Sequence, residues 1–139
     1  MTEQDIVDRL NAHSAGFIGM MGGSVTRVNP EQMSCTMQFE IGREFCHSVD
    51  VVQGGFVTAM LDAAMTHAVF ALGEDIVNVS SLEIKTNYLE PTRAGRLRAE
   101  GEIIKSGYKI AFMEGRLYDE NGLLTATSST VAKLIRPKG

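Results

Sequence analysis

Two features that can carry chemistry lie in one apolar stretch: the glycine pair Gly54-Gly55 and a single acid, Asp62. Between Phe56 and Leu72 the only residues that are not apolar are Thr58, Asp62, Thr66 and His67. An ionised carboxylate in such surroundings costs several kcal/mol unless something compensates it. No Lys or Arg lies between residues 51 and 73. We therefore interpret Asp62 as a functional acid that can act as a general base or a nucleophile.

The stretch that holds these residues is predicted to be one long helix. It is rich in Ala, Met and Leu, which are strong helix formers, and it is too long for an ordinary strand. The first N–H groups of a helix are unpaired and lie at the positive end of its dipole. Gly54 and Gly55 would let a carbonyl oxygen approach these groups closely. We therefore expect the Gly54 N–H to be an oxyanion donor.

The spacing between the two features predicts a dimer. Gly54 and Asp62 are eight residues apart, or about 12 Å along a helix. One reacting carbon cannot reach both residues on the same helix. Two antiparallel copies related by a two-fold axis can bring Gly54 of one chain to Asp62 of the other. The sequence thus predicts two composite sites at the interface of a homodimer.

Composition excludes several classes of protein. The 139 residues suit a single domain, 1–139, with 44% hydrophobic and 22% charged residues, as in ordinary globular proteins. The net charge of −4 and the pI near 5.3 argue against nucleic-acid binding. Cys35 and Cys46 form neither a disulfide framework nor a metal site. The polar N-terminus and the central Asp62 argue against a signal peptide and a membrane span, so a cytoplasmic protein is expected.

The remaining chain is predicted to form a short helix and a set of strands. Thr2 and Asp5 resemble a capping box that begins an amphipathic helix, from Thr2 to roughly Ser14. The segment Gly16 to Gly23 is expected to be a loop. Alternation and turn residues predict strands at 24–28, 33–40, 77–89, 96–105, 108–118 and 123–134.

This order of elements predicts an α+β fold. The last four strands are separated by short turns, such as the one at residues 119–122, so they are expected to form an antiparallel meander. One apolar helix and one antiparallel sheet must cover each other. We expect the sheet to wrap around the long central helix, and Cys35 to be a thiol in the core.

The helix entry resembles that of the hotdog-fold acyl-CoA thioesterases, in the PaaI-like branch named for phenylacetate degradation. Members of that branch have His-Gly-Gly at the helix start and an acid nine residues after the His. Here the stretch runs from Gln53 through Gly54-Gly55 to Asp62. The strands at residues 81–91 and 111–127 also look like those of the family. The likeness covers roughly residues 15–135.

The resemblance implies a role for further residues. Gln53 stands where most relatives have His; it can still form hydrogen bonds, but it cannot carry a proton at neutral pH. His47 matches an Asn that orients substrate or water, and Ser81 matches a Ser or Thr that supports the acid. Gly55 is expected to contact the substrate. The family also implies an acyl-CoA substrate, no metal or redox cofactor, and a dimer that often pairs into a dimer of dimers.

Other interpretations stay open at this point. Asp62 can be a structural acid bonded to Thr58 or Thr66, one turn to either side, and His47 can be an ordinary loop histidine. Within enzymes, the substrate can be an acyl-carrier-protein thioester, or the reaction can be that of a hotdog hydratase or dehydratase. A non-catalytic acyl-CoA-binding module is the alternative from another class. An intact Asp62 favours the enzyme, because pure binding does not need such an acid.

Overall fold

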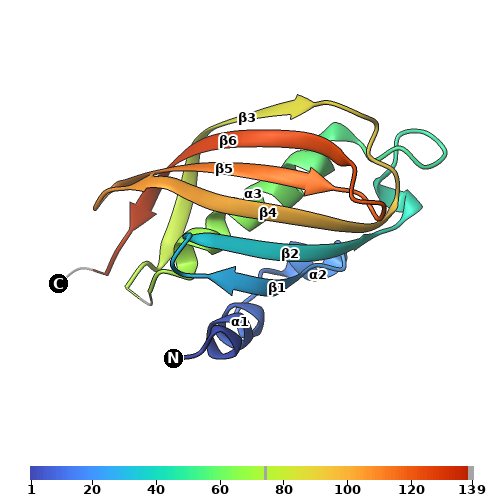
Figure 1. The fold of residues 1–139 in the computed structure, drawn as a ribbon. Helices are drawn as coiled ribbons and strands as arrows, with labels where there is room; N and C mark the ends of the chain where they lie inside the picture. Colours follow the sequence, from blue (N-terminus) through green and yellow to red (C-terminus); the bar gives the residue numbers. More distant parts are fainter. Residues whose placement is uncertain (74, 138–139) are drawn as a thin grey trace.

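One long helix lies across one face of a single antiparallel sheet, as seen in a computed structural model that describes residues 1–73 and 75–137 (Figure 1). The predicted domain, 1–139, thus includes three residues outside the described ranges. The helices are α1 (Glu3–Ala12), α2 (Gly16–Met20), the 3-10 helix η1 (Arg43–Phe45) and α3 (Gly54–Phe70). The strands are β1 (Ser24–Asn29), β2 (Ser34–Ile41), β3 (Asn78–Tyr88), β4 (Gly95–Ser106), β5 (Ile110–Tyr118) and β6 (Leu124–Ile135). The predicted α+β hotdog architecture is confirmed.

The strand order, β1-β2-β4-β5-β6-β3, corrects one prediction. Strands β4, β5 and β6 form the expected meander, but β3 pairs with β6 and not with β4. The connection from β3 to β4 contains Pro91 and makes no tight turn. It binds the loop before α3 instead, because the Val52 N–H donates to the Thr92 carbonyl over 2.8 Å and the Ala94 N–H donates to Asp50 over 2.8 Å. Strand β3 is therefore an edge strand.

Close packing of α3 on the sheet forms the core. The apolar side of α3 is buried and consists of Val57, Met60, Leu61, Ala63, Ala64, Met65, Ala68 and Val69. The helix lies so near β4 that a Cβ added to Gly101 would come within 2.4 Å of the Ala64 carbonyl oxygen. On β2, alternate residues point into the core, and burial raises the pKa of the Cys35 thiol to about 12. Cys35 is thus a core thiol, as predicted.

The N-terminal segment confirms one prediction and overturns another. Thr2 caps α1, and its side chain and that of Asp5 form the predicted capping box. The segment expected to be a loop contains helix α2. Its two glycines disfavour a helix, but Ile18 is fully buried and the Gly23 N–H donates to the Ile18 carbonyl over 2.8 Å. Burial of Ile18 therefore outweighs the local preference.

The free edge of the sheet, β3, leaves one side of α3 uncovered (Figure 1). Residues of β3 are exposed or half-buried along its whole length, on both faces. Large apolar side chains are exposed on β3 and at its ends, namely Val77, Leu82, Tyr88 and Leu89. In the single chain the sheet therefore covers one side of α3 and leaves residues on the other side half-buried. Asp62 lies half-buried on the uncovered side.

Candidate active site

Asp62 is held by a side chain from the edge strand. The Ser81 hydroxyl donates a hydrogen bond of 2.8 Å to Asp62 Oδ1. Neither Thr58 nor Thr66 is the partner of the acid: Thr66 donates to the Ala63 carbonyl, and Thr58 bonds to residues of β3. The carboxylate therefore keeps a fixed position while its second oxygen remains available for chemistry.

Asp62 lines a cavity of about 850 Å³ between α1, α2, α3 and the start of β3. The walls include the apolar side chains of Leu10, Phe17, Phe70 and Val79. His67, five residues after Asp62 on α3, also lines the cavity. Its Nδ1 lies 2.7 Å from the Ala63 carbonyl oxygen, and burial lowers the pKa of its imidazole below the ordinary value. His67 is thus a wall residue of the cavity that bonds to the backbone of its own helix.

At the other end of the site, Gln53 caps the start of α3. Its Oε1 accepts a hydrogen bond of 2.8 Å from the Gly55 N–H. Gly54 is the first helical residue, and among the residues that the structure describes no acceptor pairs with its N–H. An unpaired N–H at a helix start can receive a developing negative charge. Gln53 therefore orients the helix entry, as a cap, while the Gly54 N–H stays open.

The loop before α3 brings His47 to this helix start. The Gln53 N–H donates to the Phe45 carbonyl over 2.9 Å, which folds the loop back on itself. His47 Nδ1 lies 2.8 Å from the Ser48 hydroxyl, and the imidazole is exposed. His47, Gln53, Gly54 and Gly55 line one groove of about 560 Å³. The exposed imidazole can therefore reach a ligand in that groove.

The structure divides the six predicted site residues into two groups. His47, Gln53, Gly54 and Gly55 surround the groove at the start of α3, whereas Asp62 and Ser81 meet beside the large cavity. Within one chain the groove and the cavity share no lining residue. Within a single chain the proposed oxyanion donor and the proposed base thus lie in separate places.

Tyr88, which was not predicted as a site residue, lines the groove. Its hydroxyl donates a hydrogen bond of 2.8 Å to the Gly54 carbonyl and lies 2.9 Å from the Thr58 hydroxyl. A regular strand would place Ser81 and Thr86 on opposite faces because they are five residues apart. The register of β3 shifts between Ser81 and Glu83, so Ser81, Thr86 and Tyr88 all contact α3. This shift gives no simple signal in the sequence.

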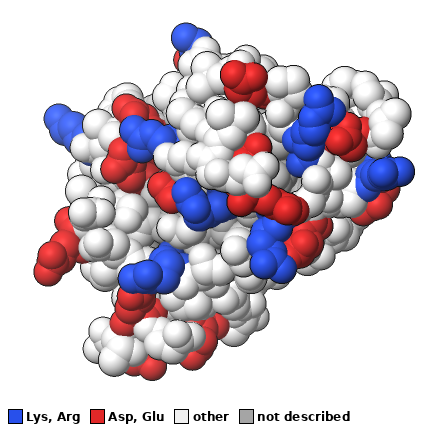
Figure 2. Space-filling model, turned by 45° about the vertical axis from the view of Figure 1, so that its right-hand side comes forward, with Lys and Arg blue, Asp and Glu red and all other residues white. Residues whose placement is uncertain are grey.

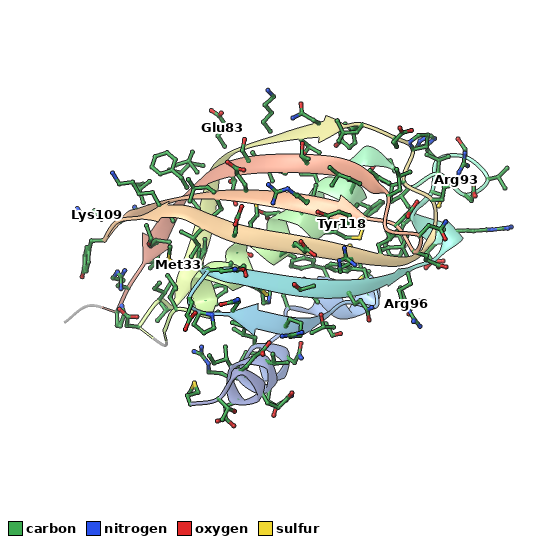
Figure 3. The ribbon with its side chains drawn as sticks, in the orientation of Figure 1. Met33, Glu83, Arg93, Arg96, Lys109 and Tyr118 are labelled. Carbon is green, nitrogen blue, oxygen red and sulfur yellow. The ribbon has the colours of Figure 1, made fainter. Side chains whose placement is uncertain are left out.

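Charged side chains near the site are largely paired. Arg93 bonds to Asp50 over 2.7 Å and Arg96 to Glu40 over 2.9 Å. Figure 3 shows Arg93 and Arg96 at the end of the sheet beside the loop that precedes α3. Positive and negative residues interleave over the face in Figure 2, which is typical of a solvated surface of mixed charge. We assign no phosphate ligand among them.

In the described residues, no three His, Cys, Asp or Glu side chains gather as metal ligands would. None of the described helices has the length and apolar character needed to cross a membrane. The cytoplasmic location and the absence of a cofactor stay predictions.

A long central helix held against an antiparallel sheet, with an acid and a glycine entry on that helix, defines a hotdog-fold thioester hydrolase. The chain belongs to the thioesterase superfamily, whose family profile matches residues 50–126. That range contains the glycine pair, Asp62, Ser81 and Tyr88. The similar structures include a phenylacetic acid degradation-related protein and the PaaI protein, so the predicted resemblance is confirmed.

Three similar proteins support this assignment. A candidate thioesterase from Ralstonia eutropha JMP134, described as related to phenylacetic acid degradation, is 28% identical, with 95% of this chain and 99% of that chain covered and a TM-score of 0.84. The E. coli PaaI protein shares the fold at 13% identity, with 96% of each chain covered and a TM-score of 0.82. A candidate esterase from Saccharolobus solfataricus is 24% identical over 111 residues, or 80% of this chain and 79% of that protein.

Proposed function

We propose that the protein is an acyl-CoA thioesterase that releases a small or medium acyl group, aromatic groups included, as the free acid. One observation carries the proposal: a single helix offers an open N–H at its glycine start and an acid fixed by Ser81. Those two groups are what thioester hydrolysis requires, namely an oxyanion donor and a base or nucleophile.

In the proposed reaction the thioester carbonyl oxygen accepts a hydrogen bond from the Gly54 N–H. Asp62 takes a proton from the attacking water, the new C–O bond forms, the C–S bond breaks, and Asp62 returns the proton to the thiolate, which leaves as the thiol. In a covalent variant Asp62 attacks the carbonyl carbon itself, and water then hydrolyses the mixed anhydride, which frees the acid and supplies the proton of the thiol. Gln53 and His47 orient the substrate from the groove, Gly55 contacts it, and Ser81 holds the acid.

A homodimer is proposed to assemble the site. The free edge of β3 presents unpaired backbone groups and exposed apolar side chains, which favours pairing with another strand. Antiparallel pairing of two β3 edges would set the two α3 helices side by side, in opposite directions. Gly54 would then face Asp62 of the partner subunit. Pairing into a dimer of dimers remains an expectation from the family.

The acyl group is proposed to occupy the cavity beside Asp62. Its volume of about 850 Å³ and the apolar part of its walls suit a small or medium acyl chain or ring. The Ralstonia relative is described as related to phenylacetic acid degradation, which supports the inclusion of aromatic acyl groups. A non-catalytic acyl-CoA-binding module is the alternative, and it would leave the bond between Ser81 and Asp62 without a chemical purpose.

The direct test measures thiol release from short, medium and aromatic acyl-CoAs by wild type and Asp62→Asn. We expect turnover by wild type and a loss of at least about 100-fold in the variant, the scale of a lost general base. Turnover that survives the substitution would reject the role of Asp62. Acyl-CoA binding without turnover by wild type would support the binding module instead.

A further inference from the structure

Tyr88 connects the edge strand to the start of the central helix. Its hydroxyl lies 2.8 Å from the Gly54 carbonyl oxygen and 2.9 Å from the Thr58 hydroxyl, and Thr58 lies 2.9 Å from the Thr86 hydroxyl. We propose that Tyr88 is a positioning residue for the oxyanion donor. This inference rests on the proposed thioesterase function and on the assignment of Gly54.

The direction of these hydrogen bonds follows from the carbonyl at their end. A carbonyl oxygen can only accept, so Tyr88 donates its single hydroxyl proton to Gly54. Thr58 must then donate to Tyr88, and Thr86 must donate to Thr58. In this series the hydroxyls of Thr58 and Tyr88 each donate one hydrogen bond and accept one, whereas Thr86, the first member, only donates. Bonds aligned in this way polarise and strengthen one another.

The helix start needs such an external support. Gly54 and Gly55 have the greatest backbone freedom and a poor helix propensity. The Gln53 side chain binds only the Gly55 N–H. Tyr88 binds the other end of the same Gly54–Gly55 peptide group, its carbonyl, and thereby fixes the residue that carries the Gly54 N–H. Strand β3 is itself held by antiparallel pairing with β6.

The absence of a side chain at Gly54 permits this contact. A Cβ at that position would lie 3.0 Å from the Tyr88 hydroxyl and 3.1 Å from the ring carbon that bears it. Glycine thus serves two purposes here: it opens the helix start to a substrate and admits the hydroxyl that fixes it. A purely structural tyrosine would stabilise the fold without affecting the reaction, and kinetics can separate the two roles.

Tyr88→Phe removes only the hydroxyl and keeps the ring in the groove. We expect kcat to fall about 10-fold, a part of the roughly 100-fold that a displacement of about 1 Å can cost. KM should stay within about twofold, because the donor acts mainly in the transition state. Tyr118→Phe, at the end of β5 (Figure 3), is the matched control and should keep wild-type kcat. Equal kcat in Tyr88→Phe and wild type would overturn the proposal.

The neighbouring threonine provides a second, conservative pair of variants. Thr58→Val removes the hydroxyl that donates to Tyr88, whereas Thr58→Ser keeps it. We expect Thr58→Val to lower kcat and Thr58→Ser to keep kcat near the wild-type value. The double variant with Tyr88→Phe should be no worse than the worse single variant, since both break the same chain of bonds. If the kcat losses of the two single variants multiplied in the double variant, the two hydroxyls would act independently, and the proposed series of hydrogen bonds would be contradicted.

Amide hydrogen exchange tests the positioning without any substrate. In Tyr88→Phe the hydrogen-bonded amide of Gly55 should exchange faster, while those of the buried part of α3 keep their wild-type rates. Unchanged exchange at Gly55 would overturn the proposal even if the enzyme were active. Absence of turnover by wild type would reject the proposed thioesterase, and exchange would still decide whether Tyr88 fixes the helix start.

Discussion

At the scale of single residues, the account depends on one backbone N–H. Gly54 is the first residue of α3, and Gln53 before it has φ −63° and ψ 138°, an extended conformation that also suits a residue before proline. Proline is well tolerated at the first helical position, where the N–H has no partner in the helix. A proline at this position therefore removes the proposed oxyanion donor with little change to the helix.

We predict that Gly54→Pro lowers kcat by about 100-fold or more, the scale of a lost oxyanion donor. Gly54→Ala is the control, because it adds the same Cβ near Tyr88 but keeps the N–H. Steady-state kinetics on the best acyl-CoA should separate the two substitutions clearly. Equal activity of the alanine and proline variants would reject the Gly54 N–H as the donor.

His67 predicts a dependence of stability on pH. Burial lowers the pKa of its imidazole below the ordinary value, so the unfolded chain takes up the proton more readily. The contribution of His67 is fully present above the ordinary pKa and is lost as pH falls towards the lowered one. Denaturant unfolding should therefore give less stability at a pH of about 5.5 than at about 7.5, with a smaller difference in His67→Gln. An unchanged difference would contradict this account.

At the scale of elements, the approach of α3 to β4 is the tightest requirement. A Cβ on Gly101 would meet the Ala64 carbonyl at 2.4 Å, and a backbone atom cannot rotate away. We predict that Gly101→Ala lowers the free energy of unfolding by about 3 kcal/mol, at the upper end of ordinary overpacking. Gly19→Ala has nothing within 4 Å and should change little. Similar denaturation curves for the two variants would show that α3 can move away from β4.

Local sequence determines where helices and strands form better than it determines which strands pair with one another. The cap at Thr2, the buried alternation on β2 and the glycine start of α3 all follow from short-range preferences. The partner of β3 depends on pairing with β6, more than 40 residues away in most of its register. Nothing between residues 77 and 89 specifies that pairing.

In the candidate site, too, the sequence indicates single residues better than it indicates contacts between distant ones. Asp62 and Gly54 stand out because of their types and spacing, and Ser81 was found through the family resemblance. The contact of Tyr88 with Gly54 joins residues 34 positions apart and requires the register shift after Ser81. Simple alternation from Ser81 would place Glu83 against the helix, whereas Figure 3 shows Glu83 directed away from the edge of the sheet. Such a residue becomes visible only in three dimensions.

At the scale of the whole molecule, the groove at the start of α3 and the cavity beside Asp62 belong to separate regions of one chain. The proposed mechanism of hydrolysis therefore requires two copies, each of which contributes one half of a site. The uncovered side of α3 and the free edge of β3 are the surfaces that such a dimer would bury. Catalysis is thus proposed to occur between chains and not within one chain.

Mixing two inactive variants tests this claim most directly. Gly54→Pro chains keep Asp62, and Asp62→Asn chains keep the Gly54 N–H, so each mixed dimer would contain one intact composite site. After joint unfolding and refolding, random pairing should restore about a quarter of wild-type thiol release, since half the dimers are mixed and each has one of two sites intact. Activity that stays absent, although differently tagged chains co-purify as mixed dimers, would contradict a site shared between subunits.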